Sequence, residues 1–151
     1  CIGVCGVECA ENVLELNRLV LADNHKNHAS ILVGRSLRLL PKPKIVVSFA
    51  DTKQGHVGYV YQATNWHYTG MSATRSDRVS ETETRHPRTA FDPNGKLVPR
   101  SAKHRYVFFV GTRKQVREFQ SLLRYPVQPY PKGDTQRYDS SADVVTQMLL
   151  I

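Results

Sequence analysis

Polar, titratable and aromatic side chains are concentrated in one stretch of this sequence, the run SFADTKQGHVGYVYQATNW at 48–66. Asp51 directly follows an apolar segment, where open α/β sheets place their ligands, so its carboxylate could orient or ionise a neighbour. His56 can titrate near neutral pH and can bind a metal ion through a neutral ring nitrogen. If residues 55–63 form a regular helix, Tyr59 lies on the same face as His56. The run therefore holds candidate catalytic residues, although a lone histidine and several aromatic residues are also typical of a protein core.

A second polar group precedes a predicted helix at 29–40. Backbone N–H groups at a helix N-terminus attract anions such as a pyrophosphate, and Lys26, Asn27 and Ser30 stand at that position. Because no glycine-rich fingerprint accompanies them, an ordinary loop before a helix explains the same residues. His25 and His28 form an HxxH pair, for which a metal site is one interpretation.

Apolar patterning indicates a mixed α/β domain that positions these groups. Strands are predicted at 13–21, 44–50, 67–69 and 105–110, and helices at 29–40, 55–63 and 112–123. The strand–helix–strand order of the first three elements is typical of a βαβ unit with parallel strands. Residues 71–102 lack an apolar period and are predicted to form a long loop.

Composition and charge limit the classes of protein that this chain can represent. Its 151 residues are 40% hydrophobic and 23% charged, which fits one globular domain and excludes wholesale disorder. No apolar run is long enough for a membrane span and no signal-peptide pattern opens the chain, so a soluble intracellular protein is expected. The net charge of +8 is concentrated in residues 23–53 and 103–137. This excess suggests a polyanionic partner such as nucleic acid, with a merely basic soluble protein as the alternative.

The three cysteines stand at positions 1, 5 and 9. An odd, clustered set is not a disulfide framework, and it lacks the CxxC pairs of a structural zinc site. We therefore expect buried, reduced thiols. Because the chain opens on Cys1 within an apolar run, we also expect it to lack its natural beginning.

Four runs together resemble the phage Mom family of DNA-modification proteins. They are ELNRL at 15–19, SFAD…GH.GYVYQATNW.YTG at 48–70, PRSAKHRYVFFVG at 99–111 and YPVQPYPKG at 125–133. The resemblance implies a GNAT-like acyltransferase fold over residues 1–138, with a mixed central sheet and flanking helices but without the N-terminal strands. Residues 139–151 form a tail that has no counterpart in the family.

The resemblance also implies an activity. A phage-encoded transferase in the host cytoplasm would convert adenine in DNA to an N6-methylcarbamoyl-type derivative, which shields phage DNA from host restriction enzymes. Double-stranded DNA would be the partner, acyl-CoA (acetyl-CoA) the cofactor, and iron a further participant in the chemistry.

Catalytic and cofactor roles are carried over onto matching positions. His56 would be a metal ligand or general base, Asp51 a second ligand or an orienting group, and Tyr61 a proton donor, with Ser48 beside them. The resemblance assigns acyl-CoA to a further set of residues, Leu19, Val20, Lys26, Asn27, Ser30, Gly34 and Arg35.

DNA contacts are assigned in the same way. Aromatic residues that could stack on a flipped adenine are Tyr59, Trp66 and Tyr68. Cations that would supply salt-dependent affinity are Arg75, Arg85, Arg88, Lys103 and Arg105.

Two other functions fit the same residues. One is an acyl-CoA-dependent N-acyltransferase that acts on a different amine, and the other is a nucleic-acid-binding remnant without catalysis. The catalytic hypothesis requires Asp51 and His56 to converge in a cleft where two parallel strands separate.

Overall fold

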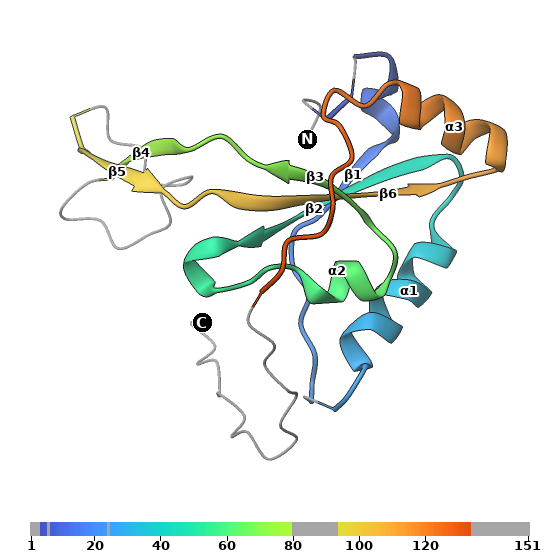
Figure 1. The fold of residues 1–151 in the computed structure, drawn as a ribbon, viewed down its shortest axis with the longest axis horizontal. Helices are drawn as coiled ribbons and strands as arrows, with labels where there is room; N and C mark the ends of the chain where they lie inside the picture. Colours follow the sequence, from blue (N-terminus) through green and yellow to red (C-terminus); the bar gives the residue numbers. More distant parts are fainter. Residues whose placement is uncertain (1–3, 6, 24, 80–93, 134–151) are drawn as a thin grey trace.

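A four-stranded mixed sheet forms the centre of the computed structural model, which describes residues 4, 5, 7–23, 25–79 and 94–133 (Figure 1). The strand order is β1 (Val13–Leu16), β2 (Lys44–Asp51), β6 (Lys103–Val110) and β3 (His67–Met71). β1 and β2 run parallel and the other pairs run antiparallel. Helix α1 (His28–Leu39) connects β1 to β2, which confirms the predicted strand–helix–strand unit and the mixed α/β class.

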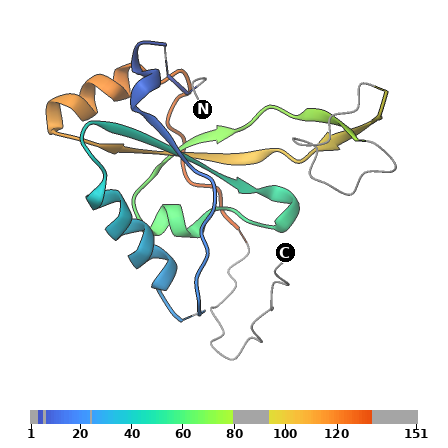
Figure 2. The same cartoon turned by 180° about the vertical axis from the view of Figure 1, so that it is seen from behind.

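Helices cover both faces of the sheet. Figures 1 and 2 show α1 and the short helix α2 (Tyr59–Ala63) on one side and α3 (Arg113–Ser121) on the other. Successive residues of a strand point to opposite faces, so Val46 packs beneath α1 and α2 whereas Ile45 and Val47 pack on the side of α3. Burial on both faces explains why the β2 sequence is almost continuously apolar.

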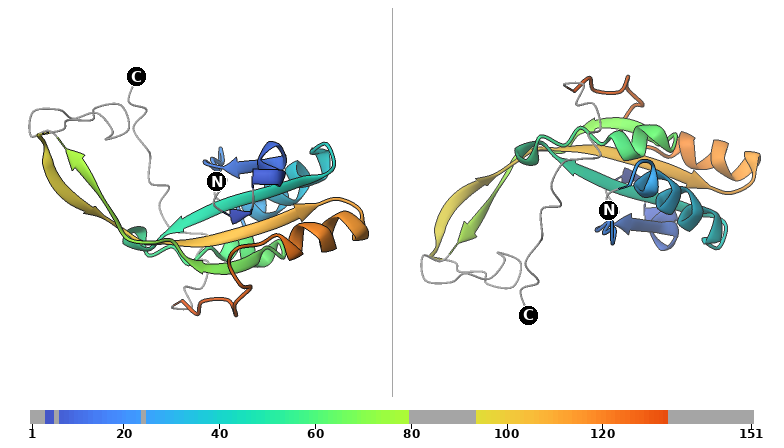
Figure 3. Two further views of the ribbon diagram at one scale, coloured as in Figure 1. Left: turned by 90° about the horizontal axis from the view of Figure 1, so that it is seen from above. Right: turned by 90° about the horizontal axis from the view of Figure 1, so that it is seen from below.

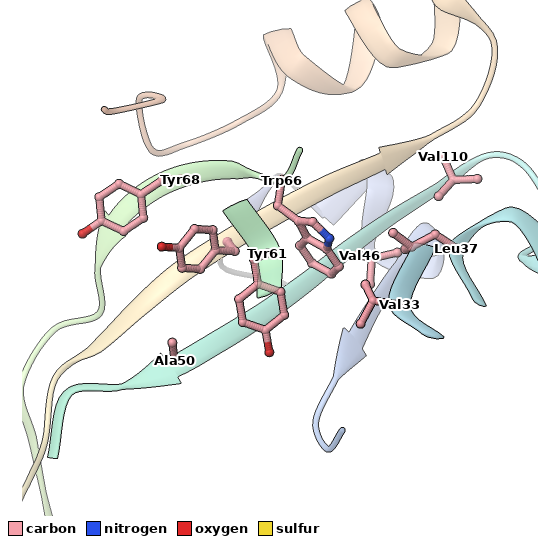
Figure 4. Packing of buried hydrophobic residues seen from close by; sticks show 9 residues of the cluster. Val33, Leu37, Val46, Ala50, Tyr61, Trp66, Tyr68 and Val110 are labelled. Carbon is pink, nitrogen blue, oxygen red and sulfur yellow. The ribbon is translucent and has the colours of Figure 1, made fainter. Parts of the chain in front are cut away.

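An aromatic cluster fills the core beneath α1 and α2 (Figure 4). The ring of Tyr61 lies 5.1 Å from those of Trp66 and Tyr106, in tilted arrangements that stabilise aromatic pairs. Trp66 is fully buried, and its indole Nε1 has no hydrogen-bond partner among the described residues. The cluster fixes the position of α2, which is too short to hold its place without packing.

The predicted loop at 71–102 is wrong where the structure describes it. β4 (Arg75–Val79) and β5 (Lys96–Arg100) pair antiparallel as a ribbon that continues β3 and β6 away from the sheet (Figure 3). Arg100 Nε and Asp77 Oδ2 are 3.0 Å apart across the two strands. The ribbon has no apolar face packed on the body, which explains why its sequence shows no apolar period. Residues 80–93 lie outside the described part.

Two elements are shorter than predicted. The strand that begins at Val13 ends at Leu16 instead of residue 21. The helix predicted at 55–63 begins at Tyr59, because Gly55 and Gly58 adopt left-handed φ angles of 67° and 84° that interrupt a right-handed helix. A Cβ at Gly58 would lie 2.5 Å from the Tyr106 ring, so this turn also requires glycine for close packing.

Helix α3 has the expected N-terminus. The Thr112 hydroxyl accepts from the Gln115 backbone, and the Gln115 side chain accepts in turn from the Thr112 N–H at 2.9 Å. This capping box satisfies two N–H groups that would otherwise lack partners. Phe119 then anchors the helix on the sheet.

The N-terminal segment differs from expectation. Cys5 is fully buried and forms half of a disulfide, so the prediction of reduced thiols is wrong.

No helix in the described residues is long and apolar enough to cross a membrane. The predicted tail, residues 139–151, lies outside the described part.

Candidate active site

A narrow slot opens where β1 and β2 separate. Their pairing ends at Leu16 and Ser48, although β2 continues to Asp51. Beyond that point, residues 17–21 leave the sheet, and a cavity of about 330 Å³ remains between them and α1. Its lining is mostly aliphatic and comprises Leu14, Glu15, Leu16, Arg18, Leu19, Val20, Leu32, Val33, Ser36, Leu37, Leu40 and Val46. We call this cavity the apolar slot.

Two hydroxyl groups are paired beside the point where the strands separate. Ser48 Oγ lies 2.8 Å from the Leu16 carbonyl oxygen and 2.7 Å from Tyr61 Oη. A carbonyl can only accept, so Ser48 donates to Leu16 and Tyr61 donates to Ser48. Ser48 is fully buried and Tyr61 is almost fully buried. Two predicted catalytic residues are therefore brought into direct contact.

Asp51 lies at the end of β2 and has several polar partners. Its carboxylate accepts from Ser101 Oγ at 2.5 Å and from the Lys53 N–H at 2.9 Å, and lies 3.4 Å from Lys103 Nζ. Partial desolvation alone would raise the pKa of Asp51, but the hydrogen bonds from Ser101 and Lys53 and the charge of Lys103 together hold the pKa below 3.8. Asp51 is thus a carboxylate at neutral pH.

His56 meets Asp51 through the backbone. Its N–H donates to the Asp51 carbonyl at 3.2 Å, whereas its side chain is exposed. The groups that set the pKa of the Asp51 carboxyl do not include the His56 ring. The turn therefore brings the two residues close, without the side-chain pair that the catalytic hypothesis requires.

The donor groups of the residues that the structure describes do not form a metal centre. Within the described ranges, no group of three or more His, Cys, Asp or Glu side chains could hold a metal ion. Asp51 is committed to Ser101 and Lys103. His28 is paired with Asp23, whose Oδ1 lies 2.6 Å from the His28 Nδ1. We therefore derive no step that involves iron.

The seven predicted cofactor residues lie in three different places around α1. Leu19 and Val20 line the apolar slot, whereas Ser30, Gly34 and Arg35 line a different cavity on another side of the helix. Lys26 and Asn27 precede α1 as exposed residues, with Asn27 in a left-handed conformation at a φ of 66°. These seven residues therefore do not line one continuous site.

Two of the three aromatic residues predicted to stack on a base are core residues. Trp66 is fully buried, and Tyr68 is 6% exposed with its hydroxyl 3.0 Å from His104 Nδ1. Tyr59 is 50% exposed at the start of α2. Tyr59 is therefore the one half-exposed residue of the three, and the described structure gives no support to a stacking role for Trp66 or Tyr68.

The predicted DNA-binding cations are also divided. Arg75 is exposed at the base of the ribbon, and Lys103 is paired with Asp51. Arg105 is buried, because its guanidinium donates to the Thr69 hydroxyl and carbonyl and lies 3.4 Å from the Tyr125 ring centroid. Arg105 is therefore corrected to a structural residue. The remaining two predicted cations, Arg85 and Arg88, lie outside the described residues.

Sequence reasoning missed some partners in this region. Ser101, which lies between β5 and β6 at the base of the ribbon, orients Asp51 from 50 positions away in sequence, and no local pattern signals that contact. For Tyr106, the sequence pattern predicts only a position in a strand. Its hydroxyl donates to the Val57 carbonyl and accepts from Gln62 Nε2 at 3.1 Å, and burial raises its pKa to about 12.

Comparison with known proteins gives consistent matches. A model of the Mom protein family matches residues 4–132, a range that includes the slot, Asp51, His56 and the ribbon. Methylcarbamoylase mom of Escherichia phage Mu is 31% identical over 137 residues, covering 79% of this chain and 56% of the relative. The chain thus spans just over half the length of that relative.

Proposed function

This chain belongs to the Mom protein family, and on that premise we propose that it acts in phage DNA modification by converting adenine in DNA to an N6-methylcarbamoyl-type derivative. The phage Mu relative is named for this group. In that reaction the exocyclic nitrogen of adenine would form a bond to the carbonyl carbon of an activated methylcarbamoyl donor, and the bond from that carbon to its leaving group would break. One proton of the amine would pass to the leaving group. The modified base would protect phage DNA from host restriction enzymes.

The divergence of two parallel strands is the observation that carries the proposal. Paired strands normally leave no room between them, whereas here β1 departs from β2 after Leu16 and opens an aliphatic slot under α1. We propose that this is the cofactor slot of a GNAT-like scaffold, in which Leu19 and Val20 contact the apolar arm of acyl-CoA. When bound, acyl-CoA would supply a thioester-activated carbonyl carbon, with the CoA thiol as its leaving group.

Polar groups on and beside β2, near the point where β1 leaves it, are suited to hydrogen bonding and proton handling. Tyr61 directs its O–H toward Ser48, so the lone pairs of its oxygen remain able to accept a hydrogen bond. Ser48 is locked by the Leu16 carbonyl, which keeps Tyr61 in one orientation. Asp51 is held as an anion three residues along β2 and would orient a cationic or N–H group of the substrate.

The ribbon supports DNA as the macromolecular partner. Its described strands carry four cations, Arg75, Arg78, Lys96 and Arg100, and one acid, Asp77. A two-stranded ribbon fits the major groove of B-DNA, and its cations would add salt-dependent affinity through phosphate contacts. The ribbon extends away from the sheet (Figure 3), and Arg75, Arg78 and Lys96 are exposed on it.

Nucleoside analysis tests the proposal directly. We would express the protein with a plasmid target, digest the DNA to nucleosides and measure a new adenine nucleoside by mass spectrometry. Tyr61→Phe retains the ring packing but removes the hydroxyl, and we expect at least about a hundredfold less modified adenine. Tyr130→Phe is the matched control, since it also loses a hydroxyl hydrogen bond, to the Trp66 carbonyl at 2.7 Å, away from the slot.

The controls separate this function from its rivals. Unmodified adenine with a folded, full-length protein would overturn the proposal. Acyl-CoA turnover without DNA would instead indicate an N-acyltransferase that acts on another amine. Equal losses in Tyr61→Phe and Tyr130→Phe would show that Tyr61 acts through stability and not through its hydroxyl.

A further inference from the structure

A second cavity lies on another side of α1 from the apolar slot. It has a volume of about 740 Å³, within the range of small-molecule sites. Its walls come from α1, the C-terminal end of α2 and the end of β6, and comprise Ser30, Ile31, Gly34, Arg35, Leu37, Arg38, Lys42, Ala63, Thr64, Asn65 and 108–111. We call this cavity the basic cleft.

The charges of the basic cleft are all positive. Arg35, Arg38 and Lys42 are exposed along its lining, and no acidic residue lines it. Among the residues that the structure describes, no carboxylate forms an ion pair with any of these three side chains. Cations at the end of a helix favour its dipole, which accounts for Arg38 but not for Arg35 in the middle of α1. Three unneutralised cations around one cavity are suited to an anionic ligand.

Gly34 exposes the backbone of α1 to this cleft. A Cβ at Gly34 would meet no atom within 4 Å, so neither close packing nor a left-handed φ explains a glycine in mid-helix. Alanine at this position would favour the helix. A bare stretch of helix backbone next to Arg35 instead allows a ligand to approach closely.

The opposite wall offers different chemistry. The side-chain amide of Asn65 is exposed there, and Phe108 contributes an aromatic ring that packs on Trp66 at 5.7 Å between ring centroids. Amide, aromatic and cationic groups together match a ligand that has a flat heterocycle and phosphate groups. A duplex would not enter a cavity of this size, whereas a nucleotide would.

We propose that the basic cleft is a binding site for a phosphorylated small molecule of nucleotide size. Arg35, Arg38 and Lys42 bind its phosphates, and the wall formed by Asn65 and Phe108 receives its heterocycle. The site is separate from the apolar slot, and it does not depend on the proposed DNA modification.

Binding of ADP to the full-length chain tests this site without any measurement of activity. Calorimetry gives the affinity, and fluorescence of the single tryptophan, Trp66, reports on the wall next to Asn65. We expect saturable binding of ADP that weakens by roughly tenfold or more in Arg35→Gln/Arg38→Gln. The matched control is Arg113→Gln/Arg117→Gln, which removes the same charge from exposed positions of α3 on the other face of the sheet.

Gly34→Ala provides a test that a structural role cannot mimic. We expect it to raise the melting temperature by about 3 °C, because alanine favours the helix, while it weakens ADP binding by filling the cleft. A purely structural glycine would lower stability and binding together. If Gly34→Ala raises stability and leaves ADP affinity unchanged, the proposal that a ligand closely approaches the backbone of α1 is overturned.

Four further outcomes would overturn the proposal. The first is that ADP shows no saturable binding, and the second is that adenosine, which has no phosphate, binds as tightly as ADP. The third is that the two double variants lose ADP affinity equally. The fourth is that ADP does not bind whereas duplex DNA binds in a way that depends on Arg35 and Arg38. Failure of DNA modification with intact ADP binding would reject the proposed function and leave this site standing.

Discussion

The apolar slot and the basic cleft share a helix but differ in chemistry. Leu37 contributes to both cavities, whereas the other side chains of α1 separate by their position around the helix. Positions three and four apart share a face, so Leu32, Val33 and Ser36 line the slot and Arg35 and Arg38 line the cleft. The same twelve-residue segment thus presents an aliphatic wall to one cavity and a cationic wall to the other.

The largest expected effect comes from truncating Leu37, the residue of α1 that lines both cavities. Leu37 is 7% exposed, so we expect Leu37→Ala to lower the free energy of unfolding by about 2–4 kcal/mol through lost burial and a new cavity. Leu39→Ala on the same helix is the matched control, because Leu39 is 85% exposed and its loss should change stability by less than about 0.5 kcal/mol. Urea denaturation measures both, and similar values for the two variants would contradict the packing of α1.

Acid should weaken the contacts of Asp51 at the carboxyl end of β2. The folded pKa of Asp51 is held below 3.8, so its partners stabilise the fold at higher pH and lose that contribution as pH falls through the folded pKa. Asp51→Asn should therefore lower stability at neutral pH and flatten the stability profile below about pH 4. The free energy of unfolding, measured from neutral pH to below pH 4, checks the sign of this effect. If Asp51→Asn shows the same loss of stability in acid as the native chain, Asp51 does not cause that loss.

The smallest expected effect concerns a helix that lines neither cavity. Thr112→Ala removes the capping box of α3 and should cost about 1 kcal/mol of stability. Because α3 packs on the other face of the sheet, ADP affinity and DNA modification per folded molecule should stay unchanged. A loss of either binding or modification would show that the two faces are coupled.

The sheet and its main helices were predictable because their signals are local. The apolar run KIVVSFA at 44–50 predicted a strand, and the helix predicted at 112–123 is found at Arg113–Ser121 with Thr112 as its N-cap. The ribbon escaped prediction for a physical reason. Because β4 and β5 pack on no hydrophobic core, their residues need not alternate between apolar and polar. Their sequence therefore resembles that of a polar loop.

The candidate site was predictable in part. Ser48 and Tyr61 were singled out and lie 2.7 Å apart, whereas His56 was expected on a helix that the glycines on either side of it prevent. Residue type alone could not separate buried aromatic residues from exposed ones, which is why Trp66 was expected to stack on a base. The burial of Arg105 depends on Tyr125, 20 positions away, and sequence patterns do not show such pairs.

The base of the ribbon is fastened to the end of β2. Ser101 donates to the Asp51 carboxylate, and the Thr52 hydroxyl donates to the Ala102 carbonyl at 2.6 Å. On the other strand, the Ser72 N–H donates to the Lys103 carbonyl at 2.8 Å. The two strands of the ribbon are therefore attached to the sheet at the place where Asp51 is held, so the orientation of the Asp51 carboxylate depends on the contacts at the base of the ribbon.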